Sequence, residues 1–196
     1  MLVLPVEEGP PEYYDKAFNG VKYPNFCLLY NWAIQALIRY RRGKLFIKNP
    51  PPPKLPYLDI GCGMGRLSTV AYFGHNILID GLDFSTFGIN NVKDYLKHVK
   101  FYCEDVWKFD KYNDYNVFIA TEFLEHVKED IKFFSLLPKG SLFVFTVPSP
   151  AWGDNHHLRY FESISDVVNR YKDVLDFIEV KIVSPGPAYG GIGIVK

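Results

Sequence analysis

Hydrophobic positions along the chain follow two kinds of pattern, on either side of a run of prolines. Between residues 12 and 47, apolar side chains such as Leu29, Ala33 and Leu37 recur at three- and four-residue spacing, which predicts a helix. The run Pro50–Pro53 cannot continue a helix and predicts a stiff spacer. We therefore expect a helical segment over 1–48, a proline-rich linker over 49–56 and a domain over 57–196.

From residue 57 onward, short apolar runs alternate with amphipathic stretches. This alternation predicts a largely parallel sheet with helices on both faces. No helical stretch separates the last two runs, so these two strands are expected to form an antiparallel hairpin. A later helix is expected to begin at Ser163, because Ser163–Asp166 has the shape of a capping box. The expected strands are 57–60, 77–82, 99–103, 116–120, 141–147, 176–183 and 191–195, and the expected helices between the early strands are 66–73, 86–96 and 129–136.

Composition and charge exclude several classes of protein. Hydrophobic residues make up 48% of the chain and aromatic residues 17%, which excludes a disordered polymer. The 22 Lys and Arg residues balance the 22 Asp and Glu residues, so no overall field attracts nucleic acid or an anionic membrane. The three cysteines are widely spaced, and we find neither a signal-peptide pattern nor a run of about 18 apolar residues. These features predict a cytoplasmic protein without a membrane partner.

A glycine-rich loop, Gly61-Cys62-Gly63-Met64-Gly65, follows the first expected strand of the domain. Ligands of open α/β sheets bind at such strand–loop–helix turns. The Gly-x-Gly-x-Gly spacing matches neither the dinucleotide fingerprint nor the P-loop. Asp83 ends the second expected strand, 83 − 61 = 22 residues after Gly61, where a carboxylate can accept both ribose hydroxyls of an adenosine. The alternative is a turn whose glycines serve only the backbone geometry.

In order along the chain, these segments resemble the motifs of class I S-adenosylmethionine-dependent methyltransferases. Residues 58–65 resemble the first motif, Asp83 matches the ribose-binding acid, and Asp105 matches the residue that binds the adenine amino group. The resemblance implies an α/β, Rossmann-like doubly wound sheet of seven strands, mostly parallel, with an antiparallel C-terminal strand. It also implies S-adenosylmethionine as cofactor, bound by Asp59, Gly61, Gly63, Gly65, Asp83, Phe84, Asp105, Val106, Thr121 and Tyr14.

The segment around Tyr14 resembles the N-terminal part that folds over the cofactor in many small methyltransferases. This resemblance implies that 1–48 is a helical lid segment with Tyr14 as a lid residue. The alternative for Tyr14 is an aromatic side chain that packs against the sheet.

Carboxylates and imidazoles follow the fourth and fifth expected strands, in Glu122-Phe123-Leu124-Glu125-His126 and His156-His157. The two strands are neighbours in a doubly wound sheet, so both loops face one crevice. We favour a metal-free active site in which Glu122, His126 and His157 are catalytic and one histidine is a general base. A second interpretation makes the group a divalent-metal site. The third is a helix start in which the dipole favours the carboxylate. The metal candidates are Glu122, Glu125, His126 and His156, or His157 in its place.

Three hypotheses about the function remain open, and two of them differ in the methyl acceptor. Small methyltransferases that act on quinones and other small molecules carry Glu-x-x-Glu-His without a metal, which implies O- or N-methylation of a small molecule or sugar. The same string with a later histidine resembles the metal-dependent small-RNA 3′-end ribose 2′-O-methyltransferases, with RNA as partner. The third hypothesis is a catalytically silent S-adenosylmethionine-binding module that serves a partner protein.

One dense basic stretch lies near the end of the first expected helix. It comprises Arg39, Arg41, Arg42, Lys44 and Lys48, interleaved with aromatic residues. Such a stretch can contact phosphates. It is also typical of a solvated helix end, where cations complement the helix dipole.

Overall fold

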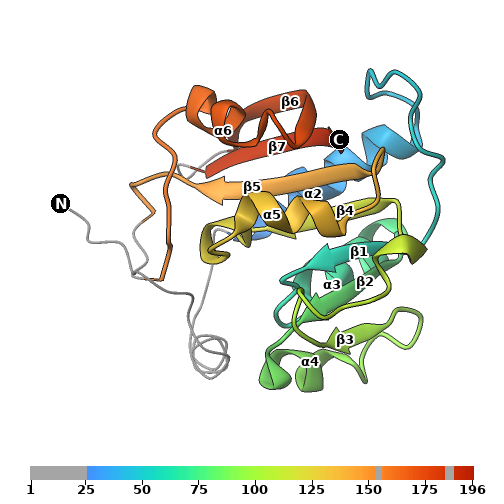
Figure 1. Ribbon diagram of the computed structural model, residues 1–196. Coiled ribbons are helices and arrows are strands. Elements are labelled where there is room, and N and C mark those ends of the chain that lie inside the picture. Colours follow the sequence, from blue (N-terminus) through green and yellow to red (C-terminus); the bar gives the residue numbers. More distant parts are fainter. Residues whose placement is uncertain (1–25, 153–155, 184–187) are drawn as a thin grey trace.

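A single seven-stranded sheet organises the molecule (Figure 1). The computed structural model describes residues 26–152, 156–183 and 188–196. The strand order is β3-β2-β1-β4-β5-β7-β6, and β7 runs antiparallel to both of its neighbours. This confirms the expected fold class. The strands are β1 (Tyr57–Ile60), β2 (Ile79–Asp83), β3 (Phe101–Cys103), β4 (Val117–Thr121), β5 (Leu142–Pro148), β6 (Leu175–Val183) and β7 (Ala188–Val195).

The helices follow the expected order with corrections at their ends. The expected helix over 12–47 has its described part in α2, which ends at Arg41, because Gly43 adopts φ 62° and its N–H bonds to the Tyr40 carbonyl. The expected helix over 86–96 ends at Val92, where the chain turns and buries Leu96. No described helix is long and apolar enough to cross a membrane. The helices are α2 (Phe26–Arg41), α3 (Arg66–His75), α4 (Thr86–Val92), α5 (Asp130–Phe133) and α6 (Ile164–Tyr171), with 3-10 turns η1 (Tyr112–Asp114), η2 (Leu124–His126) and η3 (Phe134–Leu136).

Two hydrophobic clusters cover the two faces of the sheet. Successive side chains of β4 alternate between them, since Phe118 belongs to one cluster while Val117 and Ile119 belong to the other. The first cluster includes residues of α5 and α6, and the second includes residues of α2 and α3. Figure 1 shows α5 in front of the sheet and α2 behind it. The described part of segment 1–48 is therefore part of the core that supports the sheet.

The proline-rich linker is tied to the body by two side chains. The Tyr40 hydroxyl donates a hydrogen bond to the Pro51 carbonyl, and the Asn116 amide donates one to the Pro52 carbonyl. These bonds fix the path from the end of α2 to the start of β1.

Strand β7 approaches its neighbours closely at its glycines. A Cβ atom on Gly191 would lie 2.3 Å from Cε1 of Phe145, and one on Gly190 would lie 2.7 Å from Trp32. The expected antiparallel hairpin of β6 and β7 is confirmed, and its connection over 184–187 lies outside the described residues. The absence of side chains here lets large aromatic residues pack on both faces of the strand.

We predict that Gly191→Ala destabilises the fold by about 1–3 kcal/mol, because the new methyl group overlaps the fully buried Phe145 ring. Gly74→Ala is the matched control: the position is exposed within α3 and no atom lies within 4 Å of the added Cβ. There the substitution should be neutral or stabilise by up to about 1 kcal/mol. Urea denaturation of both variants measures the difference, and equal effects would contradict the packing argument.

Candidate active site

The glycine loop joins β1 to α3 with three left-handed residues. Gly61, Gly63 and Gly65 have φ of 71°, 52° and 62°. A Cβ on Gly61 would lie 2.7 Å from Cδ2 of Phe123, and one on Gly65 would lie 2.6 Å from Cγ2 of Val92. Two of the glycines are thus required by the backbone and by packing within the protein. The Phe123 contact also shows that the loop after β4 lies against the glycine loop.

Asp83 joins the end of β2 to the glycine loop. Its Oδ2 accepts a hydrogen bond from the Gly63 N–H at 2.8 Å, and its Oδ1 accepts one from the Ser85 N–H at 2.8 Å. The side chain is 6% exposed. The structure therefore places this expected ribose-binding carboxylate beside the loop, in a position fixed by two backbone donors. Phe84, the next residue, is half-buried at the same edge.

Asp59, the acidic residue of the first motif, is buried beneath this loop. It is 1% exposed, and its Oδ1 has no hydrogen-bond partner among the described residues. Burial raises the pKa of Asp59 well above its ordinary value, and the nearby Asp83 carboxylate raises it further. A buried carboxyl group with an unused oxygen suits a ligand that presents a hydrogen-bond donor or a cation.

The remaining expected cofactor residues lie at the same carboxyl edge. Parallel pairing with β2 places the loop after β3 there, and Oδ1 of Asp105 accepts a hydrogen bond from the Trp107 N–H at 2.9 Å. Asp105 and Val106 are partly exposed. Thr121 ends β4 and is 6% exposed. Tyr14 lies outside the described residues, so its role stays an expectation.

Glu122 has a strained backbone directly after β4. Its φ is 54°, which is uncommon for a residue with a side chain. Its N–H donates to the Thr146 hydroxyl at 3.1 Å and to the Thr146 carbonyl at 3.2 Å, which fixes this geometry from β5. Burial raises the pKa of Glu122 to about 7, and the neighbouring Thr146 and Glu125 side chains oppose the rise.

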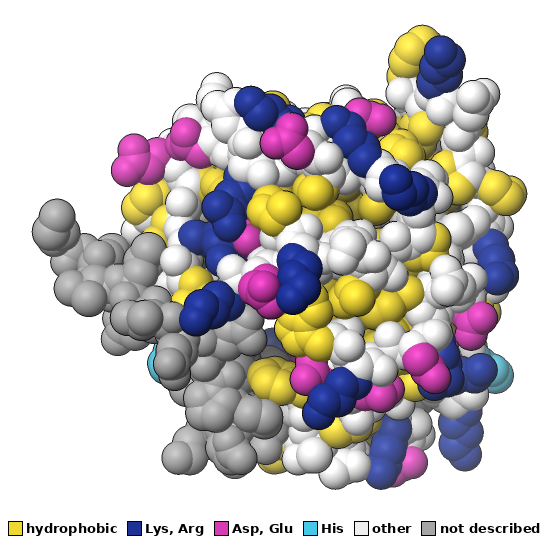
Figure 2. All heavy atoms as spheres, viewed as in Figure 1, with side chains coloured by type: hydrophobic (Ala, Val, Ile, Leu, Met, Phe, Trp, Pro, Cys, Tyr) yellow, Lys and Arg dark blue, Asp and Glu magenta, His cyan; other side chains and the backbone are white. Residues whose placement is uncertain are grey.

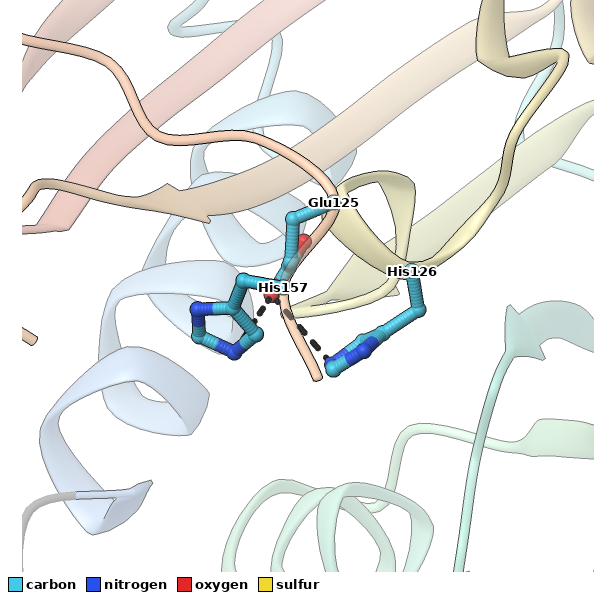
Figure 3. A group of neighbouring side chains, drawn as sticks. All are labelled: Glu125, His126 and His157. Carbon is cyan, nitrogen blue, oxygen red and sulfur yellow. Dashed lines mark ion pairs between the residues drawn. The ribbon is translucent and has the colours of Figure 1, made fainter. Parts of the chain in front are cut away.

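Glu125 lies between two imidazoles that come from different loops (Figure 3). Oε1 of Glu125 lies 3.8 Å from Nε2 of His126 and 3.9 Å from Nε2 of His157. The two rings pack edge to face with centroids 4.8 Å apart. Glu125 is fully buried and His157 is 5% exposed. One ligand atom from each of the three residues lies within 4.8 Å of the others, a donor set that a divalent metal accepts.

The structure shows which of the two alternative histidines of the candidate metal set lies beside Glu125. The imidazole beside Glu125 belongs to His157. His156 contributes its backbone carbonyl, which lies 3.2 Å from Nδ1 of His126. The two expected catalytic histidines, His126 and His157, do come together, and Glu122 joins them through Glu125.

Arg159 braces the loop that carries Glu125 and His126, a role that the sequence did not reveal. Its guanidinium donates to the carbonyls of Leu124, Val127 and Lys128, the last two at 2.7 Å and 3.1 Å. The Leu158 N–H donates to the Glu125 carbonyl at 2.8 Å. The segment after β5 therefore holds the segment after β4 by both backbone and side chain.

Asp130 holds the Arg159 guanidinium in place. The carboxylate is 1% exposed and lies 3.5 Å from Nη1 of Arg159. It also accepts hydrogen bonds from Arg170 at 2.6 Å and 3.0 Å and from the Tyr171 hydroxyl at 3.0 Å. A buried carboxylate with this many donors is well satisfied, so it keeps Arg159 in a fixed position.

A family profile described as "Methyltransferase domain" matches residues 33–177. The chain belongs to this methyltransferase-domain family. The membership and the sheet order confirm the resemblance to class I S-adenosylmethionine-dependent methyltransferases. No curated protein sequence matches the chain significantly.

Solved structures of other methyltransferases share the fold of this methyltransferase. Magnesium protoporphyrin IX methyltransferase (ChlM) of Synechocystis PCC 6803, with bound SAH, has a TM-score of 0.64 at 14% identity, over 94% of each chain. The plantazolicin methyltransferase BpumL, in complex with SAH and a substrate analogue, has a TM-score of 0.67 at 14% identity, over 95% of this chain and 91% of that one. The N-methyltransferase NodS of Bradyrhizobium japonicum WM9 has a TM-score of 0.59 at 15% identity, over 84% and 86%.

We predict that Arg159→Gln lowers the free energy of unfolding of the methyltransferase by about 2–4 kcal/mol, because three carbonyls and a buried carboxylate lose a charged donor. The substitution should also shift the imidazole NMR signals of His126 and His157. Arg170→Gln is the matched control, since it removes another partner of Asp130 but touches no carbonyl of the His126 loop. It should destabilise the protein and leave both signals in place; unmoved signals in Arg159→Gln would contradict the bracing role.

We predict a pH-dependent effect of Glu122→Gln on stability. Because the pKa of Glu122 is raised from its ordinary 4.5 to about 7, folding favours the protonated form, and that contribution is lost as the pH rises through this window. The variant stays neutral, so its stability relative to wild type should increase between about pH 5 and pH 8. Denaturation curves of both proteins over this range measure the trend, and parallel curves would show that the carboxyl group is not perturbed.

Proposed function

We propose that this methyltransferase transfers the methyl group of S-adenosylmethionine to an oxygen or nitrogen of a small molecule or sugar. The observation that carries the proposal is the group of Glu122, Glu125 and His126 after β4 with His157 after β5, beside the glycine loop that Phe123 contacts. When bound, S-adenosylmethionine supplies a methyl group already activated on a sulfonium. The protein then has to align the acceptor and handle one proton.

Residues at the carboxyl edge fit the cofactor by their chemistry. The buried Oδ1 of Asp59, unpartnered among the described residues, suits the amino group of the methionine part. Asp83 and Asp105 supply carboxylates for the ribose and the adenine, in positions held by backbone N–H groups. The carboxylates also favour a cationic ligand over a neutral one.

The carboxylate–imidazole group supplies the proton acceptor. An acceptor O–H or N–H loses its proton on methylation, and a neutral imidazole can take it. Glu125 faces Nε2 of both histidines and stabilises the imidazolium that results. Burial raises the pKa of Glu122 to about 7, so this carboxyl group can hold a proton near neutral pH beside the imidazoles.

A small acceptor agrees with the structural neighbours. The names of ChlM and BpumL refer to a magnesium porphyrin and to plantazolicin, which are small molecules compared with an RNA. We assign the same broad class of acceptor to this chain.

The metal-dependent RNA ribose methyltransferase is the second candidate. It is favoured by the same trio, because Glu125, His126 and His157 offer three ligand atoms within 4.8 Å. A metal bound there would replace the proton acceptor as the group that activates a ribose hydroxyl.

We predict that the purified protein binds S-adenosylmethionine and forms S-adenosylhomocysteine with a member of a panel of phenols, carboxylic acids, amines and sugars. His126→Asn or His157→Asn should lower kcat by about 100-fold or more and leave cofactor affinity within about threefold. His98→Asn is the control, since that ring lies against Tyr72, away from the site.

Three outcomes separate the hypotheses. Turnover that survives chelator supports the metal-free small-molecule enzyme. Turnover only with a short RNA and only with added Mg²⁺ or Mn²⁺ supports the RNA enzyme and overturns the proposal. Cofactor binding without turnover on any acceptor, RNA included, supports the silent module and also overturns it.

A further inference from the structure

A cavity lies at the edge of the sheet where the parallel strands begin, opposite the candidate active site. It has a volume of about 310 Å³ and is lined by Ile38, Arg41, Arg42 and His75. The cavity is formed by the ends of two helices, since α2 ends at Arg41 and α3 ends at His75. Helix α3 begins at the glycine loop and has 10 residues, so its far end lies about 15 Å away from that loop. The cavity is therefore separate from the candidate active site.

The two arginines of this cavity are not neutralised by the protein. Neither Arg41 nor Arg42 forms an ion pair with a carboxylate in the described parts of the chain. Arg39, Arg159 and Arg170 each do. The exposed guanidinium groups of Arg41 and Arg42 are therefore available to an anionic ligand.

Backbone N–H groups occupy several carbonyls at the two helix ends. The carbonyls of Ile38, Arg39 and Tyr40 at the end of α2 accept hydrogen bonds from the N–H groups of residues 42–44. At the end of α3, the Asn76 N–H bonds to the carbonyls of Ala71 and Tyr72. The arginines at the end of α2 therefore face fewer free carbonyl oxygens of their own helix.

The loop that follows α2 extends the basic surface. Lys44 and Lys48 flank Phe46, which is 99% exposed, and Phe73 near the end of α3 is 72% exposed. Figure 2 shows Lys or Arg and hydrophobic side chains on the part that projects at the upper right of the view, where Figure 1 places this loop. Cations interleaved with exposed aromatic rings suit a phosphate-bearing chain whose bases can stack.

We propose that the cavity of Ile38, Arg41, Arg42 and His75 binds the phosphate group of a nucleotide or of a single-stranded nucleic acid. Two adjacent guanidinium groups and an imidazole form a donor set that matches phosphate oxygens. The chain carries no net charge, so attraction of a polyanion has to come from a local surface such as this one. The site is independent of the methyl acceptor and of the proposed transfer reaction.

The test compares two double variants that remove the same charge. Arg41→Gln with Arg42→Gln removes the cavity cations, and Lys139→Gln with Lys172→Gln removes two exposed cations that do not line the cavity. The probes are inorganic phosphate and uridine monophosphate, titrated by calorimetry, and a fluorescein-labelled 12-nucleotide oligouridine, titrated by fluorescence anisotropy at several salt concentrations. Unchanged binding of S-adenosylmethionine shows that each variant is folded.

We expect wild type to bind at least one phosphate probe and the cavity variant to lose about 10-fold or more in affinity, with less than about twofold loss in the control. If the oligouridine is the ligand, the slope of log affinity against log salt should fall by about 1.4, since two phosphate contacts are lost. Binding of phosphate or uridine monophosphate without the oligouridine identifies a free nucleotide or phosphate as the source. Equal losses in both double variants, or no binding of any probe by wild type, would overturn the proposal.

Discussion

The parallel pairing of β4 with β5 is the constraint on which the candidate active site depends. Its register sets Thr121, the last residue of β4, opposite Thr146, and β5 ends at Pro148 on the same edge of the sheet. The Glu122 N–H then bonds to Thr146, and the two following loops run side by side. Arg159 closes the arrangement by binding three carbonyls of the β4 loop from the β5 loop. Without this pairing, Glu125, His126 and His157 would not face one another.

This arrangement includes backbone strain and buried carboxyl groups, which cost folding free energy and which the sheet itself does not require. Glu122 has a left-handed backbone, and Glu125 is fully buried beside it. A strained residue of this kind costs on the order of 1–3 kcal/mol and persists only where the surroundings fix it, as Thr146 and the Arg159–Asp130 brace do here. Burial also raises the pKa of Glu122 to about 7. Strain and a shifted carboxyl group together are typical of sites where chemistry occurs.

The sequence predicted what depends on local pattern and missed what depends on contacts across the sheet. All seven strands overlap the expected runs, and the central strands β1, β2, β4 and β5 are buried along their whole length, as their mostly apolar runs indicate. The first helix was expected to end within 39–44, and α2 does end at Arg41, where Gly43 takes the left-handed turn. The sequence did not show which of His156 and His157 faces Glu125. This segment is irregular, and its path depends on the hydrogen bonds of Arg159. The Arg159–Asp130 pair joins residues 29 positions apart that no motif connects.

Charge is unevenly distributed between the two edges of the sheet, and this bears on the acceptor. Asp59, Asp83, Asp105, Glu122 and Glu125 all lie at the carboxyl edge, where they favour a cationic cofactor. The same carboxylates repel the phosphates of an RNA end unless a metal ion neutralises them. The RNA hypothesis therefore requires a metal ion bound at Glu125, His126 and His157. A neutral small acceptor needs no such ion, and the adjacent arginines Arg41 and Arg42 lie at the opposite edge.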